Sequence, residues 1–251
     1  MNAFKAALGA RPQYGLWQAL ANPYTAEICA GAGFDFLVLD GEHAPNSLPL
    51  ILAQLQAVAP YPVEPVVRLA DAGRTGIKHH LDIGARTLLV PMIDSVEQAR
   101  EVVASTRYPP NGARGVGAGL ARVSRWNRIA GYLNRAEDEI CLLLQVESRA
   151  GLAAIEGIAA LDGVHGIFVG PADLAADMGH LGHAAHPDVA AAVEDGIRRI
   201  VAAGKPAGVM TLDETLAQSY AALGATFLAV GTDVALLARG AEALAARFVA
   251  R

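Results

Sequence analysis

The feature that most constrains the fold of this chain is an apolar run that ends abruptly in ionisable residues, FDFLVLDGEHAPN at residues 34–46. Aromatic and branched side chains occupy positions 34 and 36–39, and Asp40, Glu42 and His43 follow almost at once. Such a run is typical of a parallel strand that is covered on both faces. Ionisable groups at the carboxyl end of a strand are typical of active sites in α/β proteins. The stretch therefore predicts a buried strand that ends in a functional site.

The same change from apolar to polar residues recurs along the chain, and each recurrence supplies candidate site residues. Residues 66–67 lead into Arg68, residues 140–144 into Gln145 and Glu147, and residues 166–169 into Ala172 and Asp173. Because the carboxyl ends of parallel strands meet on one side of a sheet, we expect these polar residues to lie close together.

Strand-like and helix-like segments alternate through the whole sequence, which predicts an α/β fold. Eight alternations in 251 residues indicate a single (β/α)8 TIM barrel, a fold that typically takes about 250 residues. The competing fold, a doubly wound open sheet, lacks its expected glycine fingerprint here. No linker or change of composition divides residues 1–251, so we expect one domain.

The individual elements follow from periodicity and from glycine and proline signals. The predicted strands are 14–20, 34–39, 65–69, 87–93, 140–146, 164–169, 207–212 and 226–230. The predicted helices are 24–32, 48–59, 75–83, 95–106, 150–161, 187–203, 213–223 and 234–249. Ser95 with Gln98 three residues later forms a capping-box pattern, which supports the start of the fourth helix.

Residues 107–128 (RYPPNGARGVGAGLARVSRWNR) interrupt this rhythm and are too long for an ordinary connection. Their glycines do not follow a strand directly, which disfavours a dinucleotide-binding loop. We interpret this insertion as a lid or a subunit contact. Three arginines in this insertion are spaced for one face of a helix: Arg122, Arg125 and Arg128. Such a face is usually only solvated. The alternatives are a subunit interface or a funnel for acidic substrates.

Composition excludes several classes of protein. Hydrophobic residues make up 53% of the chain, but they occur in short pieces and none approaches the ~18 residues of a membrane span. The first residues lack the apolar core of a signal peptide, so we expect a cytoplasmic protein. A net charge of −5 with scattered acids argues against nucleic-acid binding. Cys29 and Cys141 are expected to be buried free thiols.

The polar residues at the predicted strand ends favour metal-assisted chemistry. Glu147 and Asp173 follow neighbouring strands, and two carboxylates with open positions suit Mg²⁺ or Mn²⁺. A proton-sharing acid pair, as in glycoside hydrolysis, is the alternative. Arg68 is placed to bind a carboxylate or an oxyanion, or else to pair with Asp40 or Glu42. His43 is the natural general base near neutral pH.

Other residues narrow the chemistry further. The three lysines, Lys5, Lys78 and Lys205, do not fall at the carboxyl end of any predicted strand, which disfavours Schiff-base catalysis. No serine nucleophile elbow is present. His180, His183 and His186 have a spacing that resembles a metal site, although a surface loop is the default interpretation because Gly182 and Pro187 disfavour a regular helix.

Together these motifs carry a resemblance to a known family. GLW, FDFLVLDGEHAPN, PVVR, TLLVPM, RYPPNGARGVG, QVES and VGPADLAADMG occur in this order and resemble the HpcH/HpaI aldolase family along the whole chain. The resemblance implies that the chain is a class II pyruvate aldolase, which cleaves 4-hydroxy-2-oxo acids to pyruvate and an aldehyde. The implied substrates are of the 4-hydroxy-2-oxoheptanedioate or 2-keto-3-deoxy sugar acid type. Such lyases serve the catabolism of aromatic compounds or sugar acids.

The resemblance also implies a role for each matching residue. Glu147 and Asp173 match ligands of a divalent cation (Mg²⁺, Mn²⁺ or Co²⁺), and Arg68 matches the arginine that stabilises the enolate. Gln145 and the backbone around Ala172 match positions that hold pyruvate. His43 matches the base, and Asp82 the acid that raises its basicity. The family further implies a homohexamer with swapped terminal helices, which assigns oligomerisation to helix 234–249.

Two other functions remain open at this point. One is another metal-enolate enzyme, a lyase or decarboxylase that acts on a 2-oxo acid at the same site. The other is a non-catalytic metabolite-binding barrel, expected only if Glu147 and Asp173 do not bind metal. The aldehyde half of the substrate is left open as well, with Trp17, Leu212 and the 107–128 insertion as candidates for its recognition.

Overall fold

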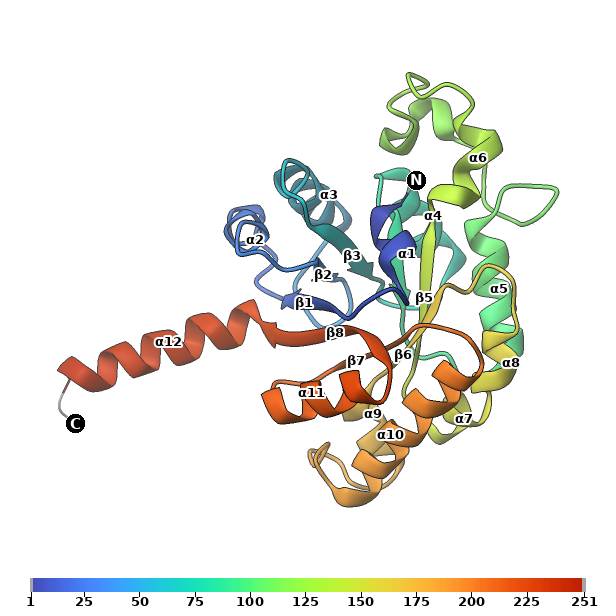
Figure 1. The fold of residues 1–251 in the computed structure, drawn as a ribbon. Helices are drawn as coiled ribbons and strands as arrows, with labels where there is room; N and C mark the ends of the chain where they lie inside the picture. Colours follow the sequence, from blue (N-terminus) through green and yellow to red (C-terminus); the bar gives the residue numbers. More distant parts are fainter. Residues whose placement is uncertain (1, 250–251) are drawn as a thin grey trace.

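Eight parallel strands form a closed barrel in sequence order, β1 to β8, in a computed structural model that describes residues 2–249 (Figure 1). The strands are β1 Gln13–Gln18, β2 Phe36–Asp40, β3 Glu64–Arg68, β4 Thr87–Val90, β5 Cys141–Val146, β6 Gly166–Val169, β7 Ala207–Met210 and β8 Ala225–Thr232. The predicted (β/α)8 architecture is therefore confirmed.

Helices surround the barrel and connect the strands. They are α2 Pro23–Ala30, α3 Leu48–Ala57, α4 Arg74–Asp82, α5 Val96–Thr106, α7 Arg149–Ala153, α8 Ile155–Ala159, α9 Pro171–Asp177, α10 Pro187–Ala202, α11 Glu214–Ala222 and α12 Asp233–Phe248. Their apolar faces pack against the outer faces of the strands and form the larger hydrophobic core, which contains Ile77, Val102 and Ile197. None of the helices in residues 2–249 is long and apolar enough to cross a membrane.

The inside of the barrel is filled by large side chains from alternate positions of the strands. Trp17, Phe36, Phe168 and Phe227 belong to this inner cluster, and the rings of Phe168 and Phe227 lie 5.9 Å apart. The Phe227 ring leaves no room for a side chain at position 208, because a Cβ on Gly208 would lie 2.0 Å from this ring. The barrel is therefore a packed core and not a pore, so ligands can enter only at its ends.

A short helix, α1 (Ala3–Ala7), closes the amino-terminal end of the barrel. Phe4 packs edge-to-face on Phe36 at 5.4 Å between ring centres. The Asn2 side chain caps α1 by accepting from the Lys5 amide and also donates to Thr87 Oγ1 at 2.9 Å. This plug leaves the carboxyl end of the barrel as the open end.

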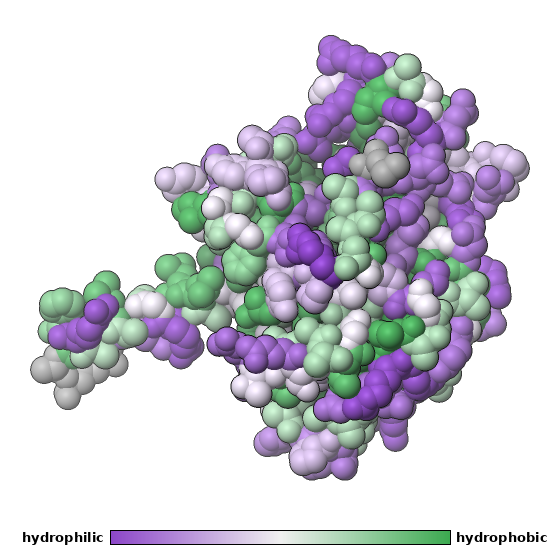
Figure 2. All heavy atoms as spheres, in the orientation of Figure 1, coloured by the Kyte–Doolittle hydropathy of each residue, from purple (hydrophilic) through white to green (hydrophobic). Residues whose placement is uncertain are grey.

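Helix α12 behaves differently, because it projects from the barrel into solvent (Figure 1). Of its residues only Asp233 is buried. Leu236, Leu237, Leu244 and Phe248 are all more than half exposed, and Figure 2 shows hydrophobic residues on this projecting helix. Such a group of exposed apolar side chains on one helix is typical of interaction surfaces.

The insertion after α5 contains two 3₁₀ helices, η1 Ala118–Leu120 and η2 Arg122–Ser124, and then α6 Tyr132–Glu139. It connects α5 to β5 and therefore lies at the amino-terminal end of the barrel, so it is not a lid over the carboxyl end of its own barrel. Arg122, Arg125 and Arg128 do not share a helical face, because η2 stops at Ser124 and Arg125 has a left-handed φ of 51°.

Most predicted elements occur within a few residues of their expected bounds, with informative exceptions. The predicted helix 150–161 is divided into α7 and α8 at Ala154, whose ψ of 0° departs from helical geometry. Helices α1, α6 and α9 were not predicted. For α9 a signal was present, since Pro171 occupies the first turn, where its missing N–H is not needed.

Candidate active site

The predicted site residues Arg68, Gln145 and Glu147 lie at the carboxyl ends of β3 and β5, at the open end of the barrel. Asp40 ends β2 and Arg68 ends β3, and the two are register partners. On the other side, Gln145 is the penultimate residue of β5 and Glu147 follows that strand directly. All four side chains are buried. Burying this many charged and polar groups together costs folding free energy unless they pair with one another or bind a ligand.

Asp40 is the hub of one half of the site. Its carboxylate accepts from Arg68 Nε at 2.9 Å and Nη2 at 2.7 Å, and from Trp17 Nε1 at 3.1 Å. It also accepts from the backbone amide of Glu42 at 3.0 Å, which turns the chain sharply after β2. Burial alone would raise the pKa of Asp40, but the hydrogen bonds and charge of Arg68 outweigh it and lower this pKa. Asp40 therefore remains an anion that holds Arg68 in place.

Arg68 is fixed from two sides, since its guanidinium also lies 4.7 Å from the centre of the Trp17 ring. Its remaining nitrogen, Nη1, lies 2.8 Å from Glu42 Oε2. The sequence left open whether Arg68 pairs with Asp40 or with Glu42, and the structure shows both pairs. The pKa of Glu42 is raised, first by burial and then by the negative charges of Asp40 and Asp173, against the lowering effect of Arg68.

His43 lies at the rim of the site, on the loop that follows β2. Its side chain is 66% exposed, and its Nε2 lies 3.9 Å from Glu42 Oε1. Asn46 fixes this loop by donating to the Asp40 carbonyl at 2.7 Å, and Gln54 donates to Asn46 at 2.7 Å. A solvent-facing imidazole on an anchored loop is free to exchange protons with a ligand and with water.

Glu147 is the hub of the other half of the site. Its Oε1 accepts from the Met92 backbone amide at 2.8 Å, and its Oε2 accepts from the Gln145 side-chain amide. Burial raises the pKa of Glu147 to about 7, and the charges of Asp173 and Glu42 add to this rise. Gly170 allows the close approach of β6, because a Cβ there would lie 2.4 Å from Glu147 Oε2.

Met92 is a site residue that the sequence did not reveal. Its φ of 56° is unusual for a residue with a side chain, and it aims the amide at Glu147. Nothing in the sequence around residue 92 signals this conformation. Trp17, by contrast, could be found from the alternation in β1, which places it on the inner face with Gly15.

Asp173 and Ala172 belong to the first turn of α9, directly after β6. Both are exposed, and the charge of Asp173 acts on Glu147 and on Glu42, which places it at the same opening. The Ala172 amide has no hydrogen-bond acceptor among residues 2–249, as expected for the first turn of a helix. The structure thus brings Asp173 and Ala172 to the site with Gln145, Glu147, Arg68 and His43.

Asp82 does not join this group within one chain. It ends α4, where the chain returns to the amino-terminal end of the barrel, and its carboxylate accepts from Arg114 Nη2 at 2.7 Å. Arg114 is fully buried and lies 4.5 Å from the centre of the Tyr108 ring, so this pair ties the insertion to α4. The predicted action of Asp82 on His43 stays a prediction, and it requires a second copy of the chain.

The lysines are also remote from the site. Lys5 and Lys205 donate to backbone carbonyls of Glu137 and Val164 at the amino-terminal end, and Lys78 lies within α4. No lysine is therefore placed to form a Schiff base at the carboxyl ends of the strands.

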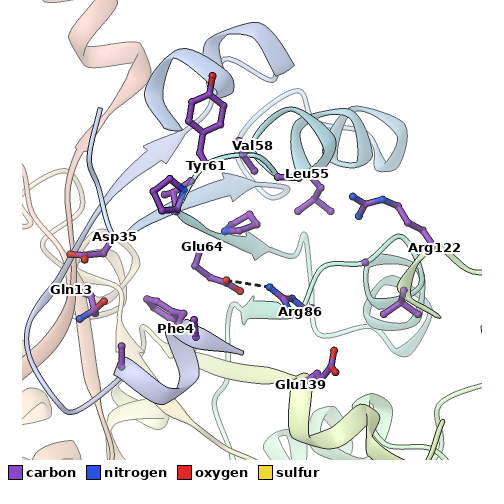
Figure 3. A pocket seen from close by; sticks show the side chains of 18 of the residues that line it. Phe4, Gln13, Asp35, Leu55, Val58, Tyr61, Glu64, Arg86, Arg122 and Glu139 are labelled. Atoms are coloured by element: carbon purple, nitrogen blue, oxygen red, sulfur yellow. Dashed lines mark ion pairs between the residues drawn. The ribbon is translucent and has the colours of Figure 1, made fainter. Parts of the chain in front are cut away.

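A cavity of about 610 Å³ lies at the opposite end of the barrel (Figure 3). Phe4, Leu55, Tyr61, Arg86 and Arg122 are among its lining residues. Within it Glu64 faces Arg86 at 3.7 Å. None of the predicted site residues lines this cavity.

The donor atoms at the carboxyl end fit a hard divalent cation. Glu147 and Asp173 offer carboxylate oxygens only, which is the ligand type that Mg²⁺ and Mn²⁺ prefer. One buried oxygen there, Gln145 Oε1, has no hydrogen-bond partner among the described residues, and Glu42 Oε2 is paired only with Arg68. Three carboxylates around one opening repel one another, and a bound cation would offset that repulsion.

A (β/α)8 barrel with buried ionisable groups at the carboxyl ends of its strands defines a class, the TIM-barrel enzymes, whose active sites lie at that end. The family model for HpcH/HpaI aldolase/citrate lyase matches residues 13–240. The chain therefore belongs to the HpcH/HpaI aldolase/citrate lyase family, which confirms the family resemblance of the sequence.

Relatives with a stated activity are similar over nearly the whole chain. A hydroxypyruvate/pyruvate aldolase of Deinococcus radiodurans is 64% identical over 98% of this chain and 90% of its own length. A 4-hydroxy-2-oxo-heptane-1,7-dioate aldolase of Salmonella heidelberg is 57% identical over 98% of this chain and 94% of its own. Among solved structures, a family protein of Burkholderia cenocepacia has a TM-score of 0.94 and 38% identity, covering 98% of this chain and 99% of that one.

Proposed function

We propose that this chain is a metal-dependent pyruvate aldolase that cleaves 4-hydroxy-2-oxo acids reversibly to pyruvate and an aldehyde. One observation carries the proposal: buried Glu147 and exposed Asp173 flank one opening with Arg68, Gln145 and His43. The high identity to two named aldolases supports the reaction type.

The proposed cofactor is a divalent cation, Mg²⁺, Mn²⁺ or Co²⁺, held by Glu147 and Asp173. When bound, it supplies a Lewis acid that polarises the 2-oxo group of the substrate. Met92 and Gln145 donate to the two oxygens of Glu147, so they orient this carboxylate without neutralising it.

The chain's own residues supply the remaining steps. The free amide of Ala172 and the side chain of Gln145 bind the pyruvate half of the substrate. His43 accepts the proton of the 4-hydroxyl, directly or through a water, as the C3–C4 bond breaks and the aldehyde leaves. The bonding electrons move to the pyruvate enolate, whose oxygen Arg68 stabilises from a fixed position. Protonation of C3 then gives pyruvate.

Two substrate classes follow from the relatives. The Salmonella name favours 4-hydroxy-2-oxoheptanedioate as substrate, and acids of the 2-keto-3-deoxy sugar type share the same reacting groups. The Deinococcus name favours a second candidate function, in which hydroxypyruvate replaces pyruvate as the nucleophile. Both use the same proton transfer and enolate, so the site accommodates either.

We propose further that α12 packs on another copy of the chain within a homohexamer. Its exposed apolar residues, which include Leu236, Leu237 and Phe248, support an intermolecular role. Light scattering would give the mass of the assembly, and loss of the assembly after truncation before α12 would support this role.

The test of the function is pyruvate release from 4-hydroxy-2-oxo acids by chelator-stripped protein that is resupplied with Mg²⁺, Mn²⁺ or Co²⁺. We expect pyruvate only with metal, and no inactivation by borohydride, because no lysine reaches the site. The reverse reaction with hydroxypyruvate and an aldehyde tests the second candidate. Release of CO₂ instead of an aldehyde would favour the decarboxylase alternative, and no product with any metal would favour a binding protein.

A further inference from the structure

We propose that His180, His186 and Asp188 form a second metal site, which binds one transition-metal ion such as Zn²⁺ or Ni²⁺. The site lies on the connection between α9 and α10, outside the group of residues assigned to catalysis. It does not rest on the proposed aldolase activity.

The backbone brings these residues together through successive turns. The amide of His180 donates to the Ala175 carbonyl, that of His183 to the His180 carbonyl, and that of His186 to the His183 carbonyl, all within 2.7 to 2.8 Å. Gly179 and Gly182 adopt left-handed φ values of 85° and 79°, which permits this tight path. As a result the rings of His180 and His186 stack 3.7 Å apart, at an angle of 14°.

Asp188 completes the cluster from the first turn of α10. Its Oδ2 lies 3.6 Å from His180 Nε2 and 3.8 Å from His186 Nδ1. One ligand atom from each of the three residues lies within 4.8 Å of the others. Donor atoms around a zinc ion with bonds of about 2.1 Å are separated by roughly 3.0 to 3.4 Å. The three donors can therefore close on one ion through side-chain rotations, without a change of the backbone.

The cluster differs from the set of three histidines that the sequence spacing suggested. The spacing of His180, His183 and His186 resembled a metal site, but His183 is exposed and does not belong to the cluster. Asp188 takes its place. Among residues 2–249 this carboxylate makes no ion pair with a lysine or an arginine, so its charge is available to a cation.

The donor set selects a different metal from that of the catalytic end. Two imidazole nitrogens and one carboxylate oxygen suit Zn²⁺, Ni²⁺, Co²⁺ or Cu²⁺, whereas the all-oxygen pair of Glu147 and Asp173 suits Mg²⁺ or Mn²⁺. His180 and His186 are 27% and 37% exposed, so an ion and its remaining water ligands can approach from solvent.

Binding has a structural consequence that can be observed. A ligated ion lies in the plane of each imidazole, so at least one ring must rotate out of the present stack. The Asp188 amide, which donates to His186 Nδ1 at 3.2 Å and caps α10, then loses this acceptor if Nδ1 takes the ion. The ion would tie the end of α9 to the start of α10 in its place.

The test measures binding of Ni²⁺ to untagged, chelator-stripped protein by equilibrium dialysis. The substitutions Glu147→Gln and Asp173→Asn are introduced together as a background that removes the catalytic carboxylates. In this background we expect one Ni²⁺ per chain, weakened at least about 10- to 100-fold by His180→Ala, His186→Ala or Asp188→Asn. His183→Ala is the matched control from the same loop and should change the affinity by less than about twofold.

A spectroscopic measurement identifies the ligands directly, so the conclusion does not depend on whether every variant folds fully. Electron paramagnetic resonance of Cu²⁺ bound to the background protein should show splitting from two imidazole nitrogens, and the double variant His180→Ala/His186→Ala should lose it. The proposal is overturned if the background protein binds no Ni²⁺, if the three ligand variants bind it unchanged, or if His183→Ala weakens binding as much as they do.

Discussion

The two ends of the barrel carry the same kinds of buried polar residue but use them differently. At the amino-terminal end Asn2 donates to Thr87, and Thr87 donates to Glu64 Oε1 at 2.8 Å, beneath the α1 plug. At the carboxyl end Gln145 Oε1 has no hydrogen-bond partner among residues 2–249, and Glu42 Oε2 is paired only with Arg68.

A cavity of about 610 Å³ lies at the amino-terminal end, and the candidate active site lies at the other. That cavity therefore points to the wrong end of this molecule. The buried ionisable groups of Asp40, Arg68 and Glu147 at the carboxyl ends of the strands identify the site better. Most of the following predictions pair a residue at the carboxyl end with a residue of the same type at the amino-terminal end.

The largest effect is expected for Glu147→Gln, which removes one of the two proposed metal ligands at nearly constant volume. Turnover with Mg²⁺ should fall by about 10³-fold or more, since metal assistance is worth several kcal/mol. Pyruvate release coupled to lactate dehydrogenase measures this loss. Glu64→Gln replaces a buried carboxylate at the other end and should keep turnover within about twofold. Equal losses in both variants would break the proposed division between the two ends.

The next effect concerns the proposed base. His43→Asn removes the exposed imidazole that we assign as the base, and turnover should fall by about 10²- to 10⁴-fold. The fold should be unaffected, because the ring is exposed. His165, which accepts from the Leu142 amide at the amino-terminal end, supplies the control His165→Asn. Normal steady-state turnover in His43→Asn would remove His43 from the mechanism.

Arg68→Ala should lower turnover by about 10²- to 10³-fold, as the loss of one fixed donor to a developing oxyanion does. Metal affinity should be retained, and titration with Mn²⁺ checks this. Arg68→Ala also leaves Asp40 buried without its partner, so the melting temperature must be measured in parallel. Arg86→Ala, at the other end, should retain turnover. An Arg68→Ala enzyme with nearly normal turnover would contradict the assigned role.

The sequence predicted the barrel and the strand ends because both depend on local patterns. Apolar runs that end in Asp40, Arg68 and Glu147 mark strands and their carboxyl ends directly. The helix α12 was also predicted, but its projection from the barrel depends on tertiary packing and has no local signal.

The remaining parts of the site depend on contacts between segments that are distant in sequence. The Met92 amide donates a hydrogen bond to Glu147, which lies 55 residues further along the chain. This contact depends on a backbone conformation that the residue type does not reveal. Asp188 replaces His183 in the second cluster because of turns at two glycines. Asp82 lies at the end of the barrel opposite to His43 because it ends α4, and its role was assigned from the family resemblance and not from its position on that helix.

A smaller effect is expected in the stability of the metal-free protein as a function of pH. The pKa of Glu147 in the folded state is about 7, above its ordinary value of 4.5, so the folded state binds the proton more tightly than the unfolded state. Stability should therefore fall as pH rises from about 4.5 to 7 and then level off, by about 3 kcal/mol for this group.

Urea unfolding of chelator-stripped protein across this pH range measures the effect. Burial also raises the pKa of Glu64, so both ends contribute to the slope, and Glu147→Gln and Glu64→Gln should each reduce it. Only Glu147→Gln should also remove the stabilisation that added Mg²⁺ gives at pH 7. An unchanged slope in Glu147→Gln would show that its carboxyl titrates in the same way in the folded and unfolded states.

The smallest effect on turnover is expected for Phe4→Ala, which removes the aromatic plug from the amino-terminal end. Phe4 is 3% exposed and packs on Phe36, so its truncation should cost about 3 to 5 kcal/mol of folding free energy. The rate per folded molecule should stay within about twofold, because Asp40, Arg68 and Glu147 are held by strand ends on the other side of the inner core. Active-site titration combined with urea unfolding separates the two quantities. A large fall in rate per folded molecule would mean that the inner core transmits changes from one end of the barrel to the other, and the ends could no longer be treated as independent.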